Sequence, residues 1–154
     1  MDGLSYSLRL LKSRLRTEFE INQALSKRGV EPDLRQEVIA KLKEAKLLDD
    51  QRFAEAWVHT RDLLSPRGGL VLRQELLQKG IPDHIISQVL SERRTAAQDE
   101  ESDQPTEVEQ ARDLLRRRER TYANLDSDTR KRRQISFLQR RGFTYDVIKR
   151  ILEA

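Results

Sequence analysis

The sequence of 154 residues contains no cysteine, and this absence excludes disulfide bonds and thiolate chemistry. Histidine is also scarce. His59 and His84 stand alone, each on a polar helix face or turn, and we interpret both as solvated surface residues rather than metal ligands or acid–base groups. No glycine-rich loop followed by Lys-Ser or Lys-Thr occurs in the sequence. These absences favour a protein that is not an enzyme and that holds neither a metal nor a cofactor.

Long apolar runs are missing as well. No stretch approaches the roughly 18 to 20 apolar residues of a membrane span, and the first residues lack the basic start and apolar run of a signal peptide. We therefore expect a cytoplasmic protein without a membrane association. The few glycines and prolines, six and four, permit long helices. Charged residues make up 36% of the chain and hydrophobic residues also 36%, which suits thin helical layers with much exposed surface.

Three short segments, residues 24–30, 75–81 and 137–143, repeat one pattern. Each has a leucine four residues before a glycine, a basic residue directly before that glycine and an apolar residue directly after it. Beyond each glycine, apolar residues recur at plus five, plus nine and plus ten, which is a helical spacing. The leucine is interpreted as core and the glycine as the left-handed residue that ends a helix. The pattern therefore indicates one supersecondary unit used three times.

The expected fold is all-α. Nine helices form three tandem three-helix repeats of the helix-turn-helix kind, in an elongated, curved body. The repeats are expected at residues 1–47, 48–94 and 108–154, with an acidic linker or helix extension at 95–107. The function is therefore sought in a repeat surface rather than in a single cleft.

Polar residues mark the expected helix starts. Thr17-x-x-Glu20 predicts a capping box, and Asp126 is expected to cap the helix that ends at Gly142. Asp49 and Asp50 permit two interpretations, helix capping or a pair of carboxylates that binds a metal. Capping is favoured, because adjacent helical residues point about 100° apart.

Charge is unevenly distributed along the chain, whose formal net charge is +4. Residues 92–109 hold 2 basic and 7 acidic residues, whereas residues 110–154 hold 13 basic and 6 acidic residues. The basic C-terminal third favours a polyanionic partner such as DNA or RNA. Charge of this kind sets affinity and does not determine sequence readout.

The arginines of this third follow helical spacings. Arg112, Arg116 and Arg120 are four residues apart and form one exposed ridge. Arg118 instead falls on the apolar stripe of the same helix, so its side chain must reach the surface or find a partner. The run at residues 130–133 opens the next helix, where positive charge opposes the helix dipole.

A costly basic helix start suggests an anionic partner, although a merely solvated face is the alternative. Phe137 is interpreted as a core residue rather than as a platform for base stacking. The expected contacts to an anionic partner are Arg112, Arg116, Arg120, Arg130, Lys131, Arg132, Arg133, Arg140 and Arg141.

Several motifs together resemble the RecX regulatory proteins. They are Leu48-Asp49-Asp50-x-Arg52-Phe53-Ala54, Arg73-Gln74-Glu75-Leu76-x-x-Lys79-Gly80-Ile81 and Phe137-Leu138-x-Arg140-Arg141-Gly142-Phe143. Residues 8–11 and 17–29 are similar to the first repeat of that family. The match covers nearly the whole chain, in order. The motif residues to which we assign a structural role are Asp49, Asp50, Phe53, Ala54, Leu76, Gly80, Leu138 and Gly142.

The resemblance implies a bacterial, cytoplasmic, all-α protein that is not an enzyme. RecX proteins bind the filament of RecA on single-stranded DNA, lodge in its groove and usually restrain the ATPase, strand-exchange and coprotease functions of RecA. Some also bind DNA directly. For this chain, the resemblance implies a monomer whose partners are the RecA filament and single-stranded DNA.

Two other functions fit the same sequence. Three-helix units with a glycine turn also occur in DNA-binding proteins of the helix-turn-helix type. Helical repeats also serve as scaffolds for other proteins.

Overall fold

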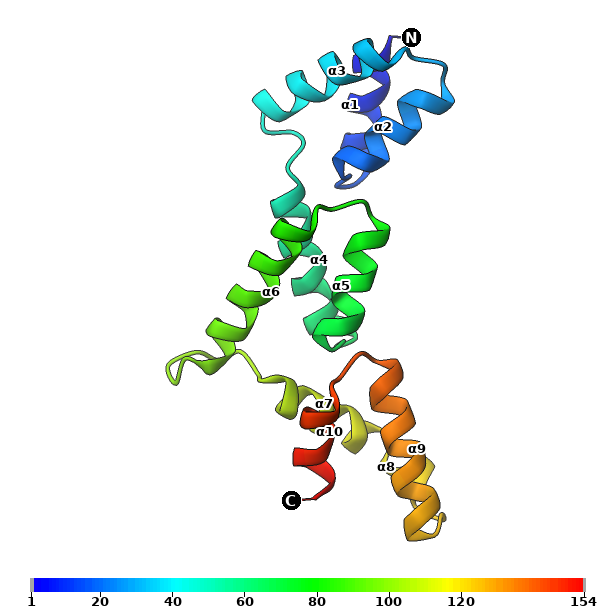
Figure 1. Cartoon of the computed structure of the whole chain (residues 1–154), viewed down its shortest axis with the longest axis vertical. Coiled ribbons are helices and arrows are strands. Elements are labelled where there is room, and N and C mark those ends of the chain that lie inside the picture. The colour runs from blue at the N-terminus through cyan, green and yellow to red at the C-terminus, as the bar shows by residue number, and fades with distance from the viewer. Residues whose placement is uncertain (1, 154) are drawn as a thin grey trace. The chain divides into compact units, whose positions relative to one another are not determined.

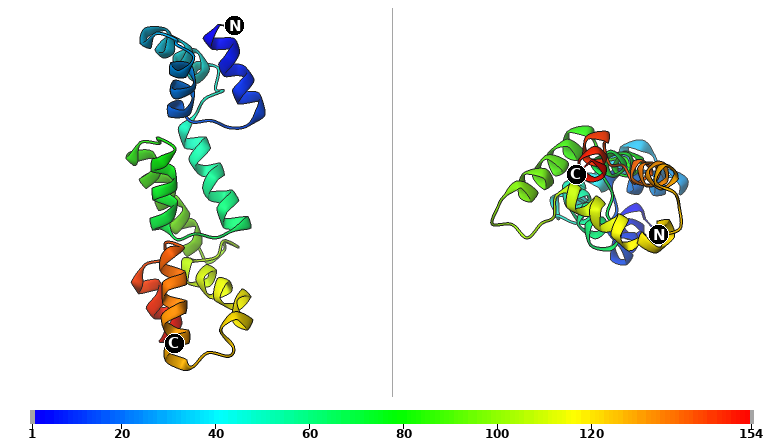
Figure 2. Two further views of the ribbon diagram at one scale, coloured as in Figure 1. Left: turned by 90° about the vertical axis from the view of Figure 1, so that its right-hand side faces the viewer. Right: turned by 90° about the horizontal axis from the view of Figure 1, so that it is seen from below.

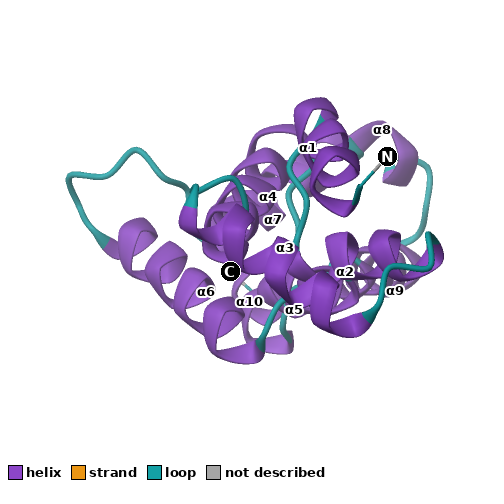
Figure 3. Cartoon of the chain, turned by 90° about the horizontal axis from the view of Figure 1, so that it is seen from above, coloured by secondary structure: helices purple, strands orange, loops and turns teal. Residues whose placement is uncertain are grey.

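A computed structural model of the chain describes residues 2–153, so the expected boundaries at residues 1 and 154 lie outside the described part. Helices and loops make up this part, and no strand occurs in it (Figure 3). The all-α class expected from the sequence is therefore confirmed. In chain order (Figure 1), the helices are α1 (Gly3–Ser13), α2 (Glu18–Lys27), α3 (Pro32–Glu44), α4 (Asp50–Leu64), α5 (Gly69–Gln78), α6 (Asp83–Gln98), α7 (Glu107–Arg117), α8 (Glu119–Tyr122), α9 (Ser127–Arg140) and α10 (Tyr145–Leu152).

The expected count of nine helices is wrong for residues 2–153, which form ten. The stretch expected as one helix breaks at Arg118, which has φ −104° and ψ 11° and separates α7 from α8. A straight helix would carry the Arg118 guanidinium into the core, where an unpaired charge is costly. The break leaves Arg118 only partly buried while Tyr122 still enters the core.

Side-chain caps explain where several helices begin. The Thr17 side chain accepts a hydrogen bond from the Glu20 amide, and the Glu20 carboxylate accepts one from the Thr17 amide, which is the expected capping box. The Asp49 carboxylate accepts from the Arg52 amide at the start of α4. Asp126 accepts from the Thr129 amide at the start of α9.

Two compact units make up the chain. The first holds the described residues up to Trp57 together with Glu75–Val89, and the second holds Val58–Gln74 together with Leu90 onward. The helices of the second repeat, α4 to α6, therefore contribute residues to both units. In each unit a separate apolar core lies under the helices of one outer repeat.

The core of the first repeat is small. Ile21 and Leu25 on α2, Leu42 on α3 and Leu48 beyond it are buried, and α1 packs against both helices. The third repeat has the larger core, in which α10 lies beside α7 and α9 (Figures 1 and 2). Its buried residues are Ala111, Leu114, Leu115, Tyr122, Phe137, Leu138, Phe143 and Ile148.

Within the first unit, the start of α2 meets the end of α5. The Thr17 hydroxyl donates to the carbonyl of Lys79 at 2.7 Å, and Lys79 directly precedes Gly80. Gly80 has φ +78°, and a Cβ there would collide with the Phe19 side chain. The Asp50 carboxylate accepts the Glu18 amide at 3.0 Å. Glycine is therefore required at position 80 both for its backbone conformation and for the close approach.

The second unit contains the same arrangement between α5 and α9. The Gly68 amide donates to the carbonyl of Arg141 at 2.8 Å, and Arg141 directly precedes Gly142. Gly142 has φ +91°, and a Cβ there would lie 2.6 Å from Val71 Cβ. We call this contact a repeat joint: the carbonyl before a left-handed glycine, at the end of one middle helix, accepts a hydrogen bond from the start of the middle helix of another repeat.

Gly80→Ala should destabilise the protein much more than Gly29→Ala. Both glycines have φ +78°, but no described atom lies within 4 Å of a Cβ placed on Gly29. We expect a loss of about 1 kcal/mol in the free energy of unfolding for Gly29→Ala from backbone strain alone. For Gly80→Ala we expect about 2 to 4 kcal/mol, because the collision with Phe19 adds to the strain. Urea unfolding followed by the fluorescence of Trp57 measures both losses. Equal losses would contradict the repeat joint.

Asp50→Asn should leave the stability at pH 7 unchanged or increase it. Burial raises the pKa of the Asp50 carboxyl, and the nearby Glu18 carboxylate raises it further, although the hydrogen bond from the Glu18 amide acts in the opposite direction. The net effect is a raised pKa, so the charged form is disfavoured in the folded state. The contribution of Asp50 to the free energy of unfolding is therefore most favourable at low pH. It declines as the pH rises from the ordinary carboxyl pKa through the raised pKa of the folded state. An asparagine still accepts the Glu18 amide without the buried charge, and it should remove this decline from the pH dependence of urea unfolding.

Asp50→Ala is the control for the hydrogen bond itself. It leaves the Glu18 amide without its acceptor and should cost about 1 to 3 kcal/mol. If the asparagine variant lost as much stability as the alanine variant at pH 7, the charge rather than the acceptor would be the stabilising feature.

Candidate functional site

Two basic grooves lie on the third repeat, and Tyr122 belongs to the lining of both. One has a volume of about 570 Å³ and is lined by Arg112, Leu115, Arg116, Glu119, Tyr122, Ala123, Arg130 and Gln134. The other, which we call the four-arginine groove, has a volume of about 590 Å³ and is lined by Arg118, Thr121, Tyr122, Thr129, Arg132, Arg133, Ser136 and Arg140. Helices α8 and α9 supply most of the lining of the second groove. No carboxylate from the described chain belongs to it.

Arg118 is the most constrained arginine of the four-arginine groove. Its guanidinium carbon lies 4.3 Å from the centre of the Phe137 ring and 5.7 Å from that of Tyr122. Such cation–π contacts hold a guanidinium in place without neutralising its charge. The Nε atom of Arg118 is buried and has no hydrogen-bond partner among residues 2–153.

The structure divides the nine residues expected to contact an anionic partner. Three line the groove that contains Glu119, namely Arg112, Arg116 and Arg130. Three line the four-arginine groove, namely Arg132, Arg133 and Arg140. Arg120 and Lys131 are exposed and belong to neither groove in the described structure, and Arg141 also lies outside both.

Two members of the expected set are engaged in local structure. The Arg130 guanidinium donates to the carbonyls of Tyr122 at 3.2 Å and Leu125 at 3.0 Å, so it holds the turn between α8 and α9. The Arg141 guanidinium donates to the Ser65 hydroxyl at 2.9 Å and lies over the Phe137 ring. Helical spacing did not distinguish these two residues from the arginines that face a groove.

Arg118 is the groove residue that was not included in the expected set. The sequence feature that could have identified it is its place on the apolar stripe, because a charged residue there must find an unusual environment. In the structure, the Arg118 guanidinium lies over the rings of Phe137 and Tyr122 in a basic groove.

Helix α9 begins before its basic run and is capped by Asp126, as expected from the sequence. The helix starts at Ser127, so its first turn contains Asp128. Hydrogen bonds from Thr129 lower the pKa of the Asp126 carboxyl, which keeps this carboxylate ionised at the positive end of the helix. Both carboxylates offset the electrostatic cost of the arginines that follow.

A buried ionic cluster fixes α7, which carries one side of this region. The Arg93 guanidinium pairs with Asp62 on α4 at 3.0 Å and with Glu107 on α7 at 2.9 Å. It also donates to the side chain of Gln110 and to the carbonyl of Arg67. The Arg93 side chain is only 9% exposed, so these bonds form where water competes poorly.

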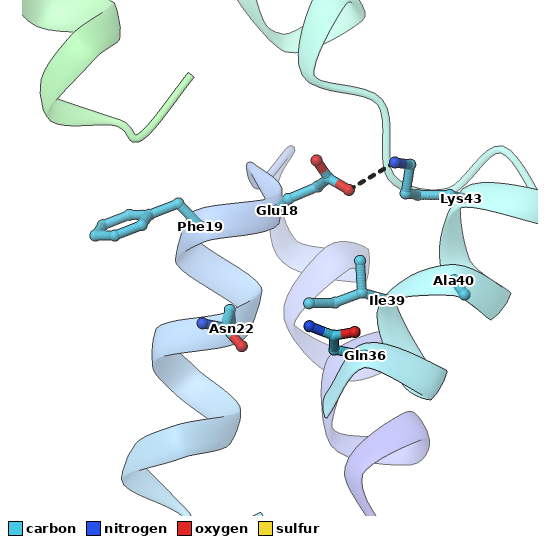
Figure 4. A pocket seen from close by; sticks show the side chains of 7 residues that line it. All are labelled: Glu18, Phe19, Asn22, Gln36, Ile39, Ala40 and Lys43. Atoms are coloured by element: carbon cyan, nitrogen blue, oxygen red, sulfur yellow. Dashed lines mark ion pairs between the residues drawn. The ribbon is translucent and has the colours of Figure 1, made fainter. Parts of the chain in front are cut away.

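A further groove, on the first repeat between α2 and α3, differs in charge (Figure 4). Its volume is about 650 Å³, and Ile39 and Ala40 supply apolar lining. Glu18 and Lys43 form an ion pair of 2.9 Å at one end, so the two charged groups compensate each other. An excess of positive charge is therefore a property of the grooves on the third repeat and not of this one.

Residues 2–153 contain no group of three or more histidine, aspartate or glutamate side chains that could hold a metal ion. No helix within these residues is long and apolar enough to span a membrane.

The fold and the grooves define an all-helical protein of three-helix repeats whose last repeat has a basic surface. Models of the first, second and third three-helix domains of RecX match residues 4–42, 49–90 and 106–152. The Regulatory protein RecX of Mycolicibacterium smegmatis is 38% identical over 146 residues, which cover 92% of this chain and 74% of that protein. That of Halorhodospira halophila is 39% identical over 145 residues, which cover 93% and 81%.

A solved structure agrees with these sequence matches. The crystal structure of RecX from Lactobacillus salivarius superposes with a TM-score of 0.84 at 27% identity, and the match covers 98% of this chain and 92% of that one. This chain belongs to the RecX family of regulatory proteins. The resemblance found in the sequence is thus confirmed.

Arg93→Met should destabilise the second unit, whereas Arg94→Met should not. Loss of the Arg93 charge leaves Asp62 and Glu107 facing each other without a cation in a partly buried site, and we expect a cost of about 3 kcal/mol. Arg94 is exposed and loses the same charge, so its replacement should change the free energy of unfolding by less than about 0.5 kcal/mol. Thermal unfolding measures both effects, and hydrogen exchange should show weaker protection of α7 in the Arg93 variant alone. Equal stability of the two variants would show that the cluster contributes little.

Proposed function

We propose that this protein binds the RecA filament on single-stranded DNA and restrains its ATPase, recombinase and coprotease activities. The observation that carries the proposal is the four-arginine groove on the third repeat of a RecX family member. Guanidinium groups bind phosphates through paired hydrogen bonds. The groove therefore suits the sugar–phosphate backbone of the DNA within the filament.

The mechanism follows from where the charges lie. The basic third repeat would face the DNA phosphates, while the other repeats contact RecA. A protein held in this way occupies the filament groove that a second DNA must enter, and it favours filament disassembly. We expect a cytoplasmic monomer in this role, acting by binding rather than by catalysis.

The direct test is ATP hydrolysis by the cognate RecA on single-stranded DNA while this protein is added. A fall in the rate of ATP hydrolysis when far fewer molecules of this protein than of RecA are present would support filament modulation, and growth-end capping in particular. An unchanged rate at stoichiometric excess, with filaments confirmed by electron microscopy, would exclude the proposal. Direct DNA binding would then become the favoured function.

Replacing the three exposed arginines of α9 should weaken filament binding. The variant R132Q/R133Q/R140Q removes three charges from the four-arginine groove. We expect a higher protein concentration for half-inhibition, and the slope of log affinity against log salt should become shallower by about 0.7 for each phosphate that the variant no longer binds. The control K12Q/K27Q/K41Q removes three exposed charges from the first repeat and should change this slope much less. An equal effect of both variants would mean that net charge alone sets the affinity.

A further inference from the structure

The four-arginine groove combines the groups that recognise a phosphate. Its four guanidinium groups come from α9 and from the break before α8, and the hydroxyls of Thr121, Thr129 and Ser136 line it with them. Guanidinium and hydroxyl groups are common donors to phosphate oxygens in nucleic-acid complexes. The carboxylate nearest in sequence to Arg118, Glu119, lines the other groove instead. The lining thus offers hydrogen-bond donors and no competing anion.

Arg118 differs from the other three arginines in its degree of constraint. Arg132, Arg133 and Arg140 are exposed on α9, and ordering their long side chains on a ligand costs entropy. The Arg118 guanidinium already rests on the Phe137 ring, and its Nε atom is buried with no hydrogen-bond partner among residues 2–153. A ligand that meets Arg118 therefore finds a charge already in position, and pre-organisation of this kind increases affinity.

The other basic groove is less suited to an anion. Its Arg130 is engaged with two backbone carbonyls, and its Arg116 lies 3.8 Å from the Asp113 carboxylate. Glu119 adds a negative charge to its lining. Of these two basic grooves, the four-arginine groove has the more available donors.

We propose that the four-arginine groove is a phosphate-binding site anchored by Arg118, and that its ligand is the backbone of a nucleic-acid strand. The inference rests on the proposed function for the identity of that strand, the single-stranded DNA of the filament. It goes further in assigning the contact to one groove and one anchoring residue. It also requires that the groove binds the strand when RecA is absent.

The test compares Arg118→Gln with Arg120→Gln. Both variants lose one charge at nearly the same place in the sequence, but only Arg118 lines the groove. The readout is the fluorescence anisotropy of a labelled oligothymidylate, measured without RecA at fixed salt. We expect binding about tenfold weaker for Arg118→Gln and changed by less than about twofold for Arg120→Gln. Equal losses would overturn the proposal, because they indicate a diffuse basic surface.

A second pair of variants leaves the packing of Arg118 intact. Ser136→Asp places a carboxylate in the groove, whereas Gln139→Asp places one on the exposed surface of α9 outside the groove lining. We expect Ser136→Asp to weaken oligonucleotide binding severalfold more than Gln139→Asp. Similar binding by the two variants would overturn the proposal even if Arg118→Gln failed to fold.

Competition separates a nucleic-acid strand from a free anion. An oligomer with uncharged methylphosphonate linkages should not compete, and inorganic phosphate should compete only at high concentration. The proposal that the ligand is a nucleic-acid strand would be overturned if Arg118 were needed to bind inorganic phosphate but not to bind the oligonucleotide. These binding measurements contain no RecA, so their outcome is independent of the RecA ATPase titration that tests the proposed function.

Discussion

Where two repeats of this protein meet, a backbone carbonyl at the end of a middle helix accepts a hydrogen bond from the other repeat. In each of two places that carbonyl belongs to the residue before a left-handed glycine, Lys79 before Gly80 and Arg141 before Gly142. A helix end normally leaves its last carbonyls without partners. Here a donor from another repeat satisfies one of them, and the missing Cβ of the glycine lets the two backbones approach. The same residue therefore ends a helix and makes the joint possible, so the joint recurs wherever the motif has a neighbouring repeat.

The sequence was informative about most features that depend on neighbours along the chain. Leucine spacing and capping residues predicted most of the helices, and the position of Gly80 predicted its positive φ. The joints could not be predicted in this way. Thr17 and Lys79 are 62 residues apart, and no local periodicity indicates which helix start meets which helix end. The break at Arg118 was missed for a related reason, since helical spacing continues through it and only the cost of burying a charge opposes a straight helix.

The same limit applies to the basic surface. Charge counting located it correctly on the third repeat, but a count treats every arginine alike. Arg130 and Arg141 act within the fold by donating to backbone carbonyls and to a serine hydroxyl. For Arg118, the sequence predicted only that the side chain must reach the surface or find a partner. In the structure it lines a groove, and its buried Nε atom has no hydrogen-bond partner among residues 2–153. Hydrogen-bond partners, which are a tertiary property, decide which charges remain available to a ligand.

The positions of the carboxylates are as important for this surface as those of the arginines. Three acidic side chains near the third repeat are engaged elsewhere: Glu107 and Asp62 with Arg93, and Asp126 at the start of α9. Each of these carboxylates stabilises a helix or a connection between helices. None of them lines the four-arginine groove in the described chain. A net excess of positive charge spread over residues 110–154 is thereby concentrated where no internal anion neutralises it. A basic surface of this kind gains most of its affinity for a polyanion by releasing counterions, so the DNA binding that we propose would depend on ionic strength.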